Sequence, residues 1–338
     1  MNMKYITYGR TGLKVSRTSF GCIPIQRISY DESTALLRRA YEGGINLYDT
    51  ANGYTTSEDR IGTALSHVRD KIVICTKSGA SNPEGLLAHL DNSLQKLRTD
   101  YIDIFQFHNP GFMPRPGGED GLYDALAKAK AAGKVRFIGI SYHRYNLAYE
   151  AVESGLYDSL QFPFSYLSTN EELKLVDHCK AHNVGILGMK GLCGGILTNA
   201  KAAFAYLRQY ENIVPIWGIE RMRDLEEFLS YEADPPSLDD ALMKAIEADR
   251  AELKGTFCRA CGYCLPCPAQ IPIPMAARMS FLMGRTYREP FLAENWQKNM
   301  RNIDNCTACG HCTANCPYEL NVPELLKSQQ ALYFDEIN

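Results

Sequence analysis

The sequence of 338 residues has no long apolar run and no long basic run. No stretch approaches the ~18 apolar residues that a membrane-spanning helix needs, which argues against an integral membrane protein. The formal net charge of -3 argues against nucleic acid or an anionic membrane surface as the main partner. A small molecule is the better expectation. Met1 begins a polar stretch with no apolar signal segment, so we expect a cytoplasmic protein without disulfides.

Cysteine, by contrast, is concentrated in two runs near the C-terminal end, and each run is closed by proline. A cubane iron-sulfur cluster holds each iron through one soft sulfur ligand, and eight thiols at this spacing suit two such clusters. The pattern therefore predicts two 4Fe-4S clusters and a role in electron transfer. The runs are Cys258-x2-Cys261-x2-Cys264-x2-Cys267-Pro268 and Cys306-x2-Cys309-x2-Cys312-x3-Cys316-Pro317. The other four cysteines are scattered, and we expect them to serve packing.

The second run has the spacing of bacterial ferredoxins, in which three close cysteines bind one cluster and the fourth binds the other. On that pattern Cys316 joins the three leading cysteines of the first run, and Cys267 joins those of the second. The first run departs from the pattern because two residues, not three, precede Cys267. The alternative is a pair of structural zinc sites with four cysteines each, because Cys-x2-Cys is also zinc-ribbon spacing.

Short apolar runs alternate with amphipathic stretches over residues 17–232, which indicates a parallel sheet covered by helices. Eight strand and helix units in this length predict an α/β fold, a (β/α)8 TIM barrel. The expected strands are Thr18–Gly21, Ile45–Tyr48, Ile72–Thr76, Ile102–Phe107, Val135–Ile140, Leu160–Phe162, Val184–Leu187 and Ile213–Ile216.

Other signals divide the chain into two domains. Residues 4–15 predict an N-terminal β-hairpin that could close the barrel floor, and Ser81 with Glu84 predicts a capping box for the helix over residues 83–97. Prolines at 235 and 236 break the pattern, so we expect the barrel in residues 1–235 and a small, mostly helical ferredoxin-like domain in residues 236–338. This second domain has few apolar residues. We therefore expect no core of its own and disorder without metal.

Polar residues follow three neighbouring strands of the predicted barrel, where active sites of this fold lie. Tyr54 could donate a proton to a nascent alkoxide, since a nearby ammonium lowers the pKa of a phenol from ~10. Asp49 would hold Lys77, and His108 could donate to the same carbonyl oxygen and polarise it. The predicted catalytic residues are Asp49, Tyr54, Lys77 and His108.

The motif Asp-Thr-Ala-x-x-Tyr-x-x-Ser-Glu at residues 49–58, with Lys77 and His108, resembles the aldo-keto reductase family. With the two cysteine runs, the whole chain is similar to the subgroup that has a C-terminal ferredoxin-like 4Fe-4S domain. This resemblance implies a barrel that binds NADPH without a Rossmann fold and transfers hydride to an aldehyde or ketone. The absence of Gly-x-Gly-x-x-Gly after the first strand is consistent with it.

The resemblance also implies where the coenzyme binds. Ser141 and Gln161 would hold the nicotinamide amide, and Tyr142 stands where many members have Asn. The loop over residues 189–195 would cover the nicotinamide and pyrophosphate, and the loop after the eighth strand would reach the adenosine end. Its arginines could bind the 2′-phosphate, which favours NADPH over NADH. The expected coenzyme contacts are Ser141, Gln161, Met189, Lys190, Gly194, Gly195, Gly218, Arg221, Arg223 and Glu227.

The main hypothesis is an NADPH-dependent oxidoreductase that acts on an aldehyde, ketone or quinone, with Tyr54 as the general acid. Hydride transfer needs no one-electron carrier, so two roles remain open for the clusters. They could exchange electrons with a ferredoxin, flavodoxin or flavin, or they could be structural or sense oxygen. A redox-sensing or electron-transfer module that binds NADPH is the alternative from another class. The substrate and the oligomeric state stay open.

Overall fold

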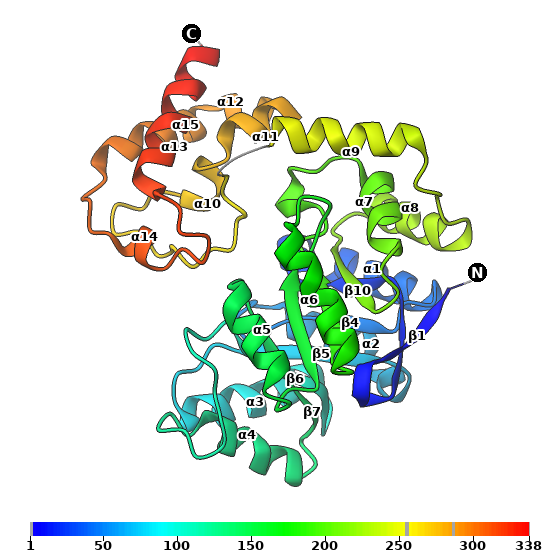
Figure 1. Cartoon of the computed structure of the whole chain (residues 1–338). Helices are drawn as coiled ribbons and strands as arrows, with labels where there is room; N and C mark the ends of the chain where they lie inside the picture. The colour runs from blue at the N-terminus through cyan, green and yellow to red at the C-terminus, as the bar shows by residue number, and fades with distance from the viewer. Residues whose placement is uncertain (1–2, 254–256, 286–287, 338) are drawn as a thin grey trace. The chain divides into compact units, whose positions relative to one another are not determined.

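The computed structural model describes residues 3–253, 257–285 and 288–337. Eight parallel strands close into a barrel in the order β10-β3-β4-β5-β6-β7-β8-β9, surrounded by helices α1 to α8 (Figure 1). The predicted (β/α)8 barrel is therefore confirmed. Its strands are β3 (Ser19–Gly21), β4 (Leu47–Asp49), β5 (Val73–Ser78), β6 (Ile102–His108), β7 (Val135–Ser141), β8 (Ser159–Pro163), β9 (Gly185–Met189) and β10 (Ile213–Gly218).

Fifteen α-helices are described along the chain, eight within residues 30–233 and the rest after residue 239. The first eight are α1 (Tyr30–Glu42), α2 (Ser57–Leu65), α3 (Pro83–Leu97), α4 (Leu122–Ala131), α5 (Tyr145–Glu153), α6 (Asn170–Ala181), α7 (Ala200–Arg208) and α8 (Met222–Ala233). The others are α9 (Asp240–Glu252), α10 (Ile273–Ala276), α11 (Met279–Arg285), α12 (Glu289–Leu292), α13 (Glu294–Arg301), α14 (His311–Ala314) and α15 (Val322–Ile337). Among the described helices, we find none that combines the length and apolar character needed to cross a bilayer.

The barrel strands are buried along almost their whole length, as expected for strands that helices cover on one side and a packed interior on the other. All six residues of β5 and six of the seven in β6 are buried. This explains why each strand appears in the sequence as a short apolar run rather than as an alternating pattern. Polar residues interrupt these runs at both ends, and Asp49, Lys77 and His108 lie at or near the C-terminal ends of β4, β5 and β6.

The expected N-terminal hairpin is present as β1 (Tyr5–Tyr8) and β2 (Leu13–Ser16), paired antiparallel. Its apolar side chains, Tyr8 and Val15 among them, share one buried cluster with residues of β4, β5, β6, β9 and β10. The phenol of Tyr8 lies 2.7 Å from the hydroxyl of Ser159 at the start of β8. The hairpin therefore closes the N-terminal end of the barrel and leaves the opposite end for chemistry.

Side-chain caps fix the starts of helices α1 and α3. Helix α1 begins with a complete capping box between Ser29 and Glu32. Helix α3 has the expected bounds, but the expected capping box of Ser81 and Glu84 is wrong. Asn82 is the N-cap, and its side chain accepts a hydrogen bond from the backbone N–H of Gly85 over 2.8 Å. Both residue types cap helices well, so the register of the loop decides between them.

The chain divides into two compact units. The first unit comprises Met1–Gly191 and Phe204–Ser237, and the second comprises Leu192–Ala203 and Leu238–Asn338. The second unit thus includes the two cysteine runs and also a twelve-residue segment that follows β9. Its first four residues, 192–195, belong to the loop over residues 189–195 in which we expected coenzyme contacts.

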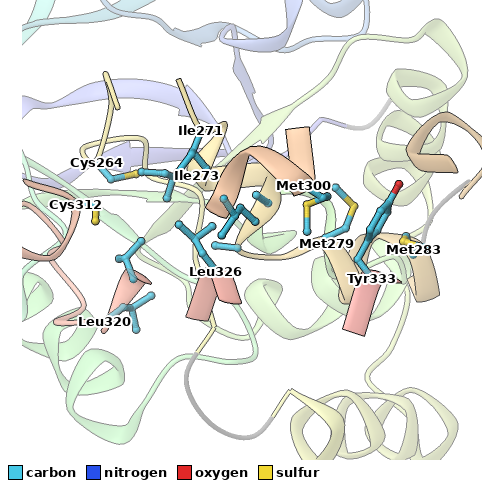
Figure 2. Close-up of a cluster of buried hydrophobic side chains, with 14 residues drawn as sticks. Cys264, Ile271, Ile273, Met279, Met283, Met300, Cys312, Leu320, Leu326 and Tyr333 are labelled. Atoms are coloured by element: carbon cyan, nitrogen blue, oxygen red, sulfur yellow. The ribbon is translucent and has the colours of Figure 1, made fainter. Parts of the chain in front are cut away.

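The second unit contains a hydrophobic core, contrary to expectation. Met279, Met300 and Tyr333 are fully buried within it, and Figure 2 shows them together with Met283. Cys264 and Cys312 belong to the same cluster. The expectation of no core was wrong because the apolar residues are spread over α10, α11, α13 and α15, and none of these forms a long run in the sequence. The buried residues are Cys264, Ile271, Ile273, Ala276, Ala277, Met279, Met283, Met300, Ile303, Cys312, Leu320, Val322, Leu326 and Tyr333.

Candidate active site and cysteine centres

The register of the barrel brings three predicted catalytic residues to one edge. Asp49 ends β4, Lys77 lies near the end of β5, and His108 ends β6. Parallel pairing aligns these strands, with Asp49 beside Cys75 and Lys77 beside Gln106. Tyr54 lies five residues after Asp49, in the turn before α2. All four side chains therefore belong to the catalytic end of the barrel.

Lys77 is the centre of the group. Its Nζ atom donates to Oδ1 of Asp49 and to the backbone oxygen of Thr50, each over 2.7 Å, and the side chain is almost fully buried. Burial is the largest single influence on the pKa of Lys77 and lowers it, but Asp49, Tyr54 and Cys75 together raise it more, so the net pKa is raised. Burial raises the pKa of Asp49, and Lys77 acts against that change. Since the amine donates to two oxygens at short distance, we assign an ion pair.

Tyr54 lies against both Lys77 and His108. The Nζ atom of Lys77 is 5.5 Å from the centre of the Tyr54 ring, and the His108 ring meets the Tyr54 ring edge to face at 6.0 Å. Burial raises the pKa of Tyr54, and the charge of Lys77 lowers it by a smaller amount. Lys77 acts in the expected direction, but the net pKa is raised, opposite to expectation. The phenol is thus held protonated, as a proton donor must be.

His108 is neutral in this environment. Burial and then the nearby charge of Lys77 lower its pKa from 6.5 to about 3. A neutral imidazole still has one N–H to donate, so it can bind a carbonyl oxygen without adding charge. Tyr54 and His108 therefore offer two uncharged donors, and both side chains keep part of their surface exposed.

Further buried polar residues support the group, and sequence reasoning did not single them out. The carboxylate of Glu58 accepts a hydrogen bond from Thr76 over 2.6 Å, and the amide of Gln106 donates to the Cys75 sulfur over 2.8 Å. Glu58 belongs to the motif at residues 49–58, and Gln106 lies two residues before His108. Their position in the sequence could have indicated them, because a polar residue inside or beside an apolar strand is buried and needs a hydrogen-bond partner.

The two residues expected at the nicotinamide amide lie on adjacent strands. Ser141 and Gln161 face each other in the register of β7 and β8. The amide nitrogen of Gln161 donates to Oδ2 of Asp49 over 3.3 Å, and its buried Oε1 makes no hydrogen bond within the described structure. An unsatisfied buried acceptor beside the catalytic ion pair fits a ligand that brings an N–H donor, as a carboxamide does.

Tyr142, at the position where many members of the resembled family have asparagine, is fully buried, and its hydroxyl donates to the backbone oxygen of Phe112 over 2.7 Å. It fixes the loop after β6. The remaining expected coenzyme residues lie in two places. Met189 ends β9, and Lys190 follows with φ of 61°, whereas Gly194 and Gly195 are exposed residues of the second unit.

The other expected coenzyme residues follow β10. Gly218 ends that strand, and Arg221 and Arg223 flank the start of α8, where both point to Asp224 over 3.0 and 3.5 Å. Their side chains are more than half exposed. Glu227 accepts a hydrogen bond from the Tyr231 hydroxyl and is exposed. The two guanidinium groups are therefore largely exposed, although each is paired with Asp224.

The cysteine runs line two cavities in the second unit. Both cavities are lined by Cys264 and Cys312, so they adjoin. The other thiols of the two runs separate by cavity: one cavity has Cys258, Cys261 and Cys316, and the other has Cys267, Cys306 and Cys309. Each fourth cysteine therefore lies with the opposite run, as the ferredoxin spacing predicts. A cavity surrounded by thiols, with carbon side chains such as Ile273 between them, fits a cubane cluster.

Comparison with known proteins gives matches to both parts of the chain. The sequence model of the Aldo/keto reductase family matches residues 17–212, and that of a 4Fe-4S dicluster domain matches residues 257–321. L-galactose dehydrogenase of Arabidopsis thaliana is 30% identical over 210 residues, covering 56% of this chain and 66% of the relative. An aldo-keto reductase of Bacillus subtilis is 28% identical over 219 residues, covering 58% and 64%.

The chain thus spans slightly less than two thirds of these curated relatives. Among solved structures, an aldo-keto reductase from Pseudomonas aeruginosa superimposes with a TM-score of 0.61 at 25% identity. The match covers 68% of this chain and 94% of that one. The similarity to the relatives therefore concerns the barrel, and the dicluster domain is matched separately.

Proposed function

Because the chain belongs to the aldo/keto reductase family and carries a 4Fe-4S dicluster domain, we propose that it is an NADPH-dependent oxidoreductase that reduces an aldehyde, ketone or quinone. The observation that carries the proposal is the buried ion pair of Lys77 and Asp49 beneath Tyr54, with neutral His108 against the same ring.

In this reaction Tyr54 is the proton donor. NADPH, when bound, would supply the hydride. As negative charge develops on the carbonyl oxygen, the Tyr54 hydroxyl and an N–H of His108 would stabilise it, and the Tyr54 proton would pass to the oxygen. The ammonium of Lys77 would then stabilise the phenolate that remains, while Asp49 keeps Lys77 in place. Each of the four residues thus has a separate task.

Two groups of residues would bind the coenzyme. Gln161 and Ser141 would hold the carboxamide, and the unsatisfied Oε1 atom of Gln161 supports this role. At the other end, the exposed guanidinium groups of Arg221 and Arg223 would bind the 2′-phosphate, which favours NADPH over NADH. Met189, Lys190, Gly194, Gly195, Gly218 and Glu227 are the further proposed contacts.

We propose two 4Fe-4S clusters with crossed ligands. Cys258, Cys261, Cys264 and Cys316 would hold one cluster, and Cys267, Cys306, Cys309 and Cys312 the other. The clusters would supply one-electron transfer to or from a ferredoxin, flavodoxin or flavin. The sharing of Cys264 and Cys312 by both cavities supports close clusters, between which electrons could pass.

Turnover tests the barrel chemistry. Protein purified without oxygen is assayed with NADPH and a panel of aldehydes, ketones and quinones. The proposal expects activity that falls about 10²- to 10⁴-fold in Tyr54→Phe, as the loss of a general acid does. Tyr30→Phe, which removes a hydroxyl bound to Asp59 at the surface, should keep full activity. Tight NADPH binding without turnover in either variant or the parent would favour a redox sensor instead.

Metal analysis tests the second unit. Two cubanes require about eight irons and as many sulfides per chain, and reduction should give electron paramagnetic resonance signals of 4Fe-4S clusters. About two zinc ions in place of iron would remove the electron-transfer role.

A further inference from the structure

A second group of metal-ligating side chains lies on the outside of the barrel. Glu153 is the last residue of α5, His178 lies in the last turn of α6, and His182 is the residue that caps that helix. The Nε2 atoms of the two histidines are 2.9 and 4.0 Å from the same carboxylate oxygen of Glu153. One ligand atom from each residue lies within 4.8 Å of the others.

The histidines are oriented before any ion binds. The His182 Nδ1 atom lies 3.1 Å from the backbone oxygen of His178, and a proton on Nδ1 would leave Nε2 as a free lone pair. The His178 ring stacks on Tyr149 at 4.1 Å. His178 Nε2 is buried and makes no hydrogen bond within the described structure, although the Glu153 carboxylate is close. A cation between the nitrogen and the carboxylate would satisfy both.

Charge and distance fit a borderline divalent cation. An imidazole whose Nε2 lone pair faces a carboxylate oxygen can bind a cation together with that oxygen. Two ligands of one tetrahedral zinc are about 3.3 Å apart, close to the distances here. Two nitrogens and one carboxylate oxygen suit Zn²⁺ better than Mg²⁺ or Ca²⁺.

The location indicates a structural role. The C-terminal ends of barrel helices lie near the N-terminal ends of the strands, away from the catalytic end. The guanidinium of Arg10, next to the hairpin strands, donates to the backbone oxygens of His182 and Gly155 over 2.7 and 3.2 Å. We propose that Glu153, His178 and His182 form a zinc site that joins α5 to α6 at the closed end of the barrel.

X-ray absorption at the zinc edge tests the site in cluster-loaded protein, because it separates nitrogen and oxygen ligands from the sulfur of the cysteine runs. We expect one zinc per chain with N/O neighbours at about 2.0 Å and a rise in Tm of a few degrees with added zinc. The zinc with N/O neighbours and the rise in Tm should each be lost in His178→Asn and also in His182→Asn. The exposed His67, changed to Asn, is the matched control and should retain them. Zinc with sulfur neighbours at about 2.3 Å, or zinc binding unaffected by both variants, would overturn the proposal.

An independent observation concerns the second unit. Arg278 is almost fully buried, and its NH1 nitrogen donates to the backbone oxygens of Gly194 and Cys193 over 3.0 and 3.4 Å. Its Nε atom donates to the backbone oxygen of Pro274 over 2.8 Å. The guanidinium therefore connects the start of α11 to the segment that follows β9.

The same guanidinium lies close to the first cysteine run. An added Cβ on Gly194 would be 3.0 Å from the NH1 nitrogen of Arg278. An added Cβ on Gly194 would be 3.5 Å from the Cβ of Ala260, which lies between Cys258 and Cys261. Gly194 has φ of +69°, a conformation that glycine tolerates best. The loop therefore packs directly on the run that would hold a cluster.

Both ends of this segment are joined to barrel elements, at Gly191 after β9 and at Phe204 within α7. Resting on the proposed function, we infer that Arg278 is a positioning residue: it holds the backbone at Cys193 and Gly194 in place for the coenzyme. This gives the second unit a role in hydride chemistry that requires no electron to leave the clusters.

Coenzyme binding to cluster-loaded protein tests the inference. Loss of buried hydrogen bonds from a charged group should raise the Kd for NADPH about tenfold or more in Arg278→Gln, with unchanged iron content and little change in kcat at saturating NADPH. The exposed Arg288, changed to Gln, is the control. An unchanged Kd in Arg278→Gln would overturn the inference.

Amide hydrogen exchange over residues 192–199 provides a readout that needs no coenzyme. Faster exchange in Arg278→Gln, but not in Arg288→Gln, would support the role of Arg278 in holding this segment. Equal exchange in the two variants would contradict it. If the parent protein binds no NADPH, the proposed function fails, and the exchange result still decides whether Arg278 holds the segment.

Discussion

The Nζ atom of Lys77 donates to the Oδ1 atom of Asp49 over 2.7 Å, and both side chains are buried. Two charges removed from water are tolerated only because each is close to the other and further hydrogen bonds satisfy them. Thr50 and Gln161 supply those bonds. The catalytic end of the barrel is therefore built around one ion pair, and its loss should affect stability and activity together.

Lys77→Met should be strongly harmful. It leaves the Asp49 carboxylate buried without its cation, so we expect a loss of about 3–5 kcal/mol in the free energy of unfolding. Asp49→Asn/Lys77→Met should regain part of that stability and none of the activity. Urea unfolding and NADPH turnover measure the two effects. Lys71→Met is the control, since Lys71 is an exposed side chain. Full stability in Lys77→Met would contradict the buried ion pair.

His108 should make the fold sensitive to acid. Its pKa is lowered from 6.5 to about 3 in the folded protein, so below pH 6.5 the unfolded chain binds a proton that the folded chain does not. Stability from this group is therefore complete above about pH 6.5 and falls as the pH decreases toward about 3. The urea midpoint of the parent should fall more steeply between pH 7 and about pH 5 than that of His108→Gln. His67→Gln should behave like the parent. Parallel midpoints in the parent and His108→Gln would contradict a buried neutral imidazole.

Much of the barrel could be predicted from the sequence because each strand is buried on both sides and leaves a short apolar run. The ends of β4, β5 and β6 then follow from where those runs stop, which is how Asp49, Lys77 and His108 could be grouped. The sequence could not indicate Asn82 as a cap in place of Ser81, since both residues suit the position and the loop decides.

The second unit was harder to predict, for a physical reason. Its core is made of single apolar residues from separate helices, such as Met279, Met300 and Tyr333. These residues form no periodic apolar pattern in the sequence. The role of Arg278 was equally hard to predict, because it donates to the backbone oxygens of Gly194 and Cys193, 84 and 85 positions away. Every residue type has a backbone oxygen, so the sequence gives no sign of such a contact. Such long-range contacts carry no local pattern.

Coenzyme choice should depend on two exposed arginines. In Arg221→Gln/Arg223→Gln, the Kd for NADPH should rise about 10- to 100-fold, because charge-assisted hydrogen bonds to the 2′-phosphate are lost. The Kd for NADH should change little, since NADH has no such phosphate and is its own control. Fluorescence titration of the cluster-loaded protein measures both. An equal weakening for the two coenzymes would show that the arginines act through the structure of the loop.

The crossed ligand arrangement makes a prediction that pairs of serine substitutions can decide. Cys316 lines the cavity of the first run, so Cys258→Ser/Cys316→Ser should damage one cluster and leave about four irons per chain. Cys306→Ser/Cys316→Ser should damage both and leave almost none, because Cys306 lines the other cavity. If each run instead bound its own cluster, the two results would be exchanged. Iron and sulfide analysis after anaerobic purification measures the outcome, with Cys179→Ala as the control for loss of a thiol in the barrel. Because both double variants remove two thiols and differ only in which cavities they affect, a difference between them reports ligand pairing and not a general loss of folding.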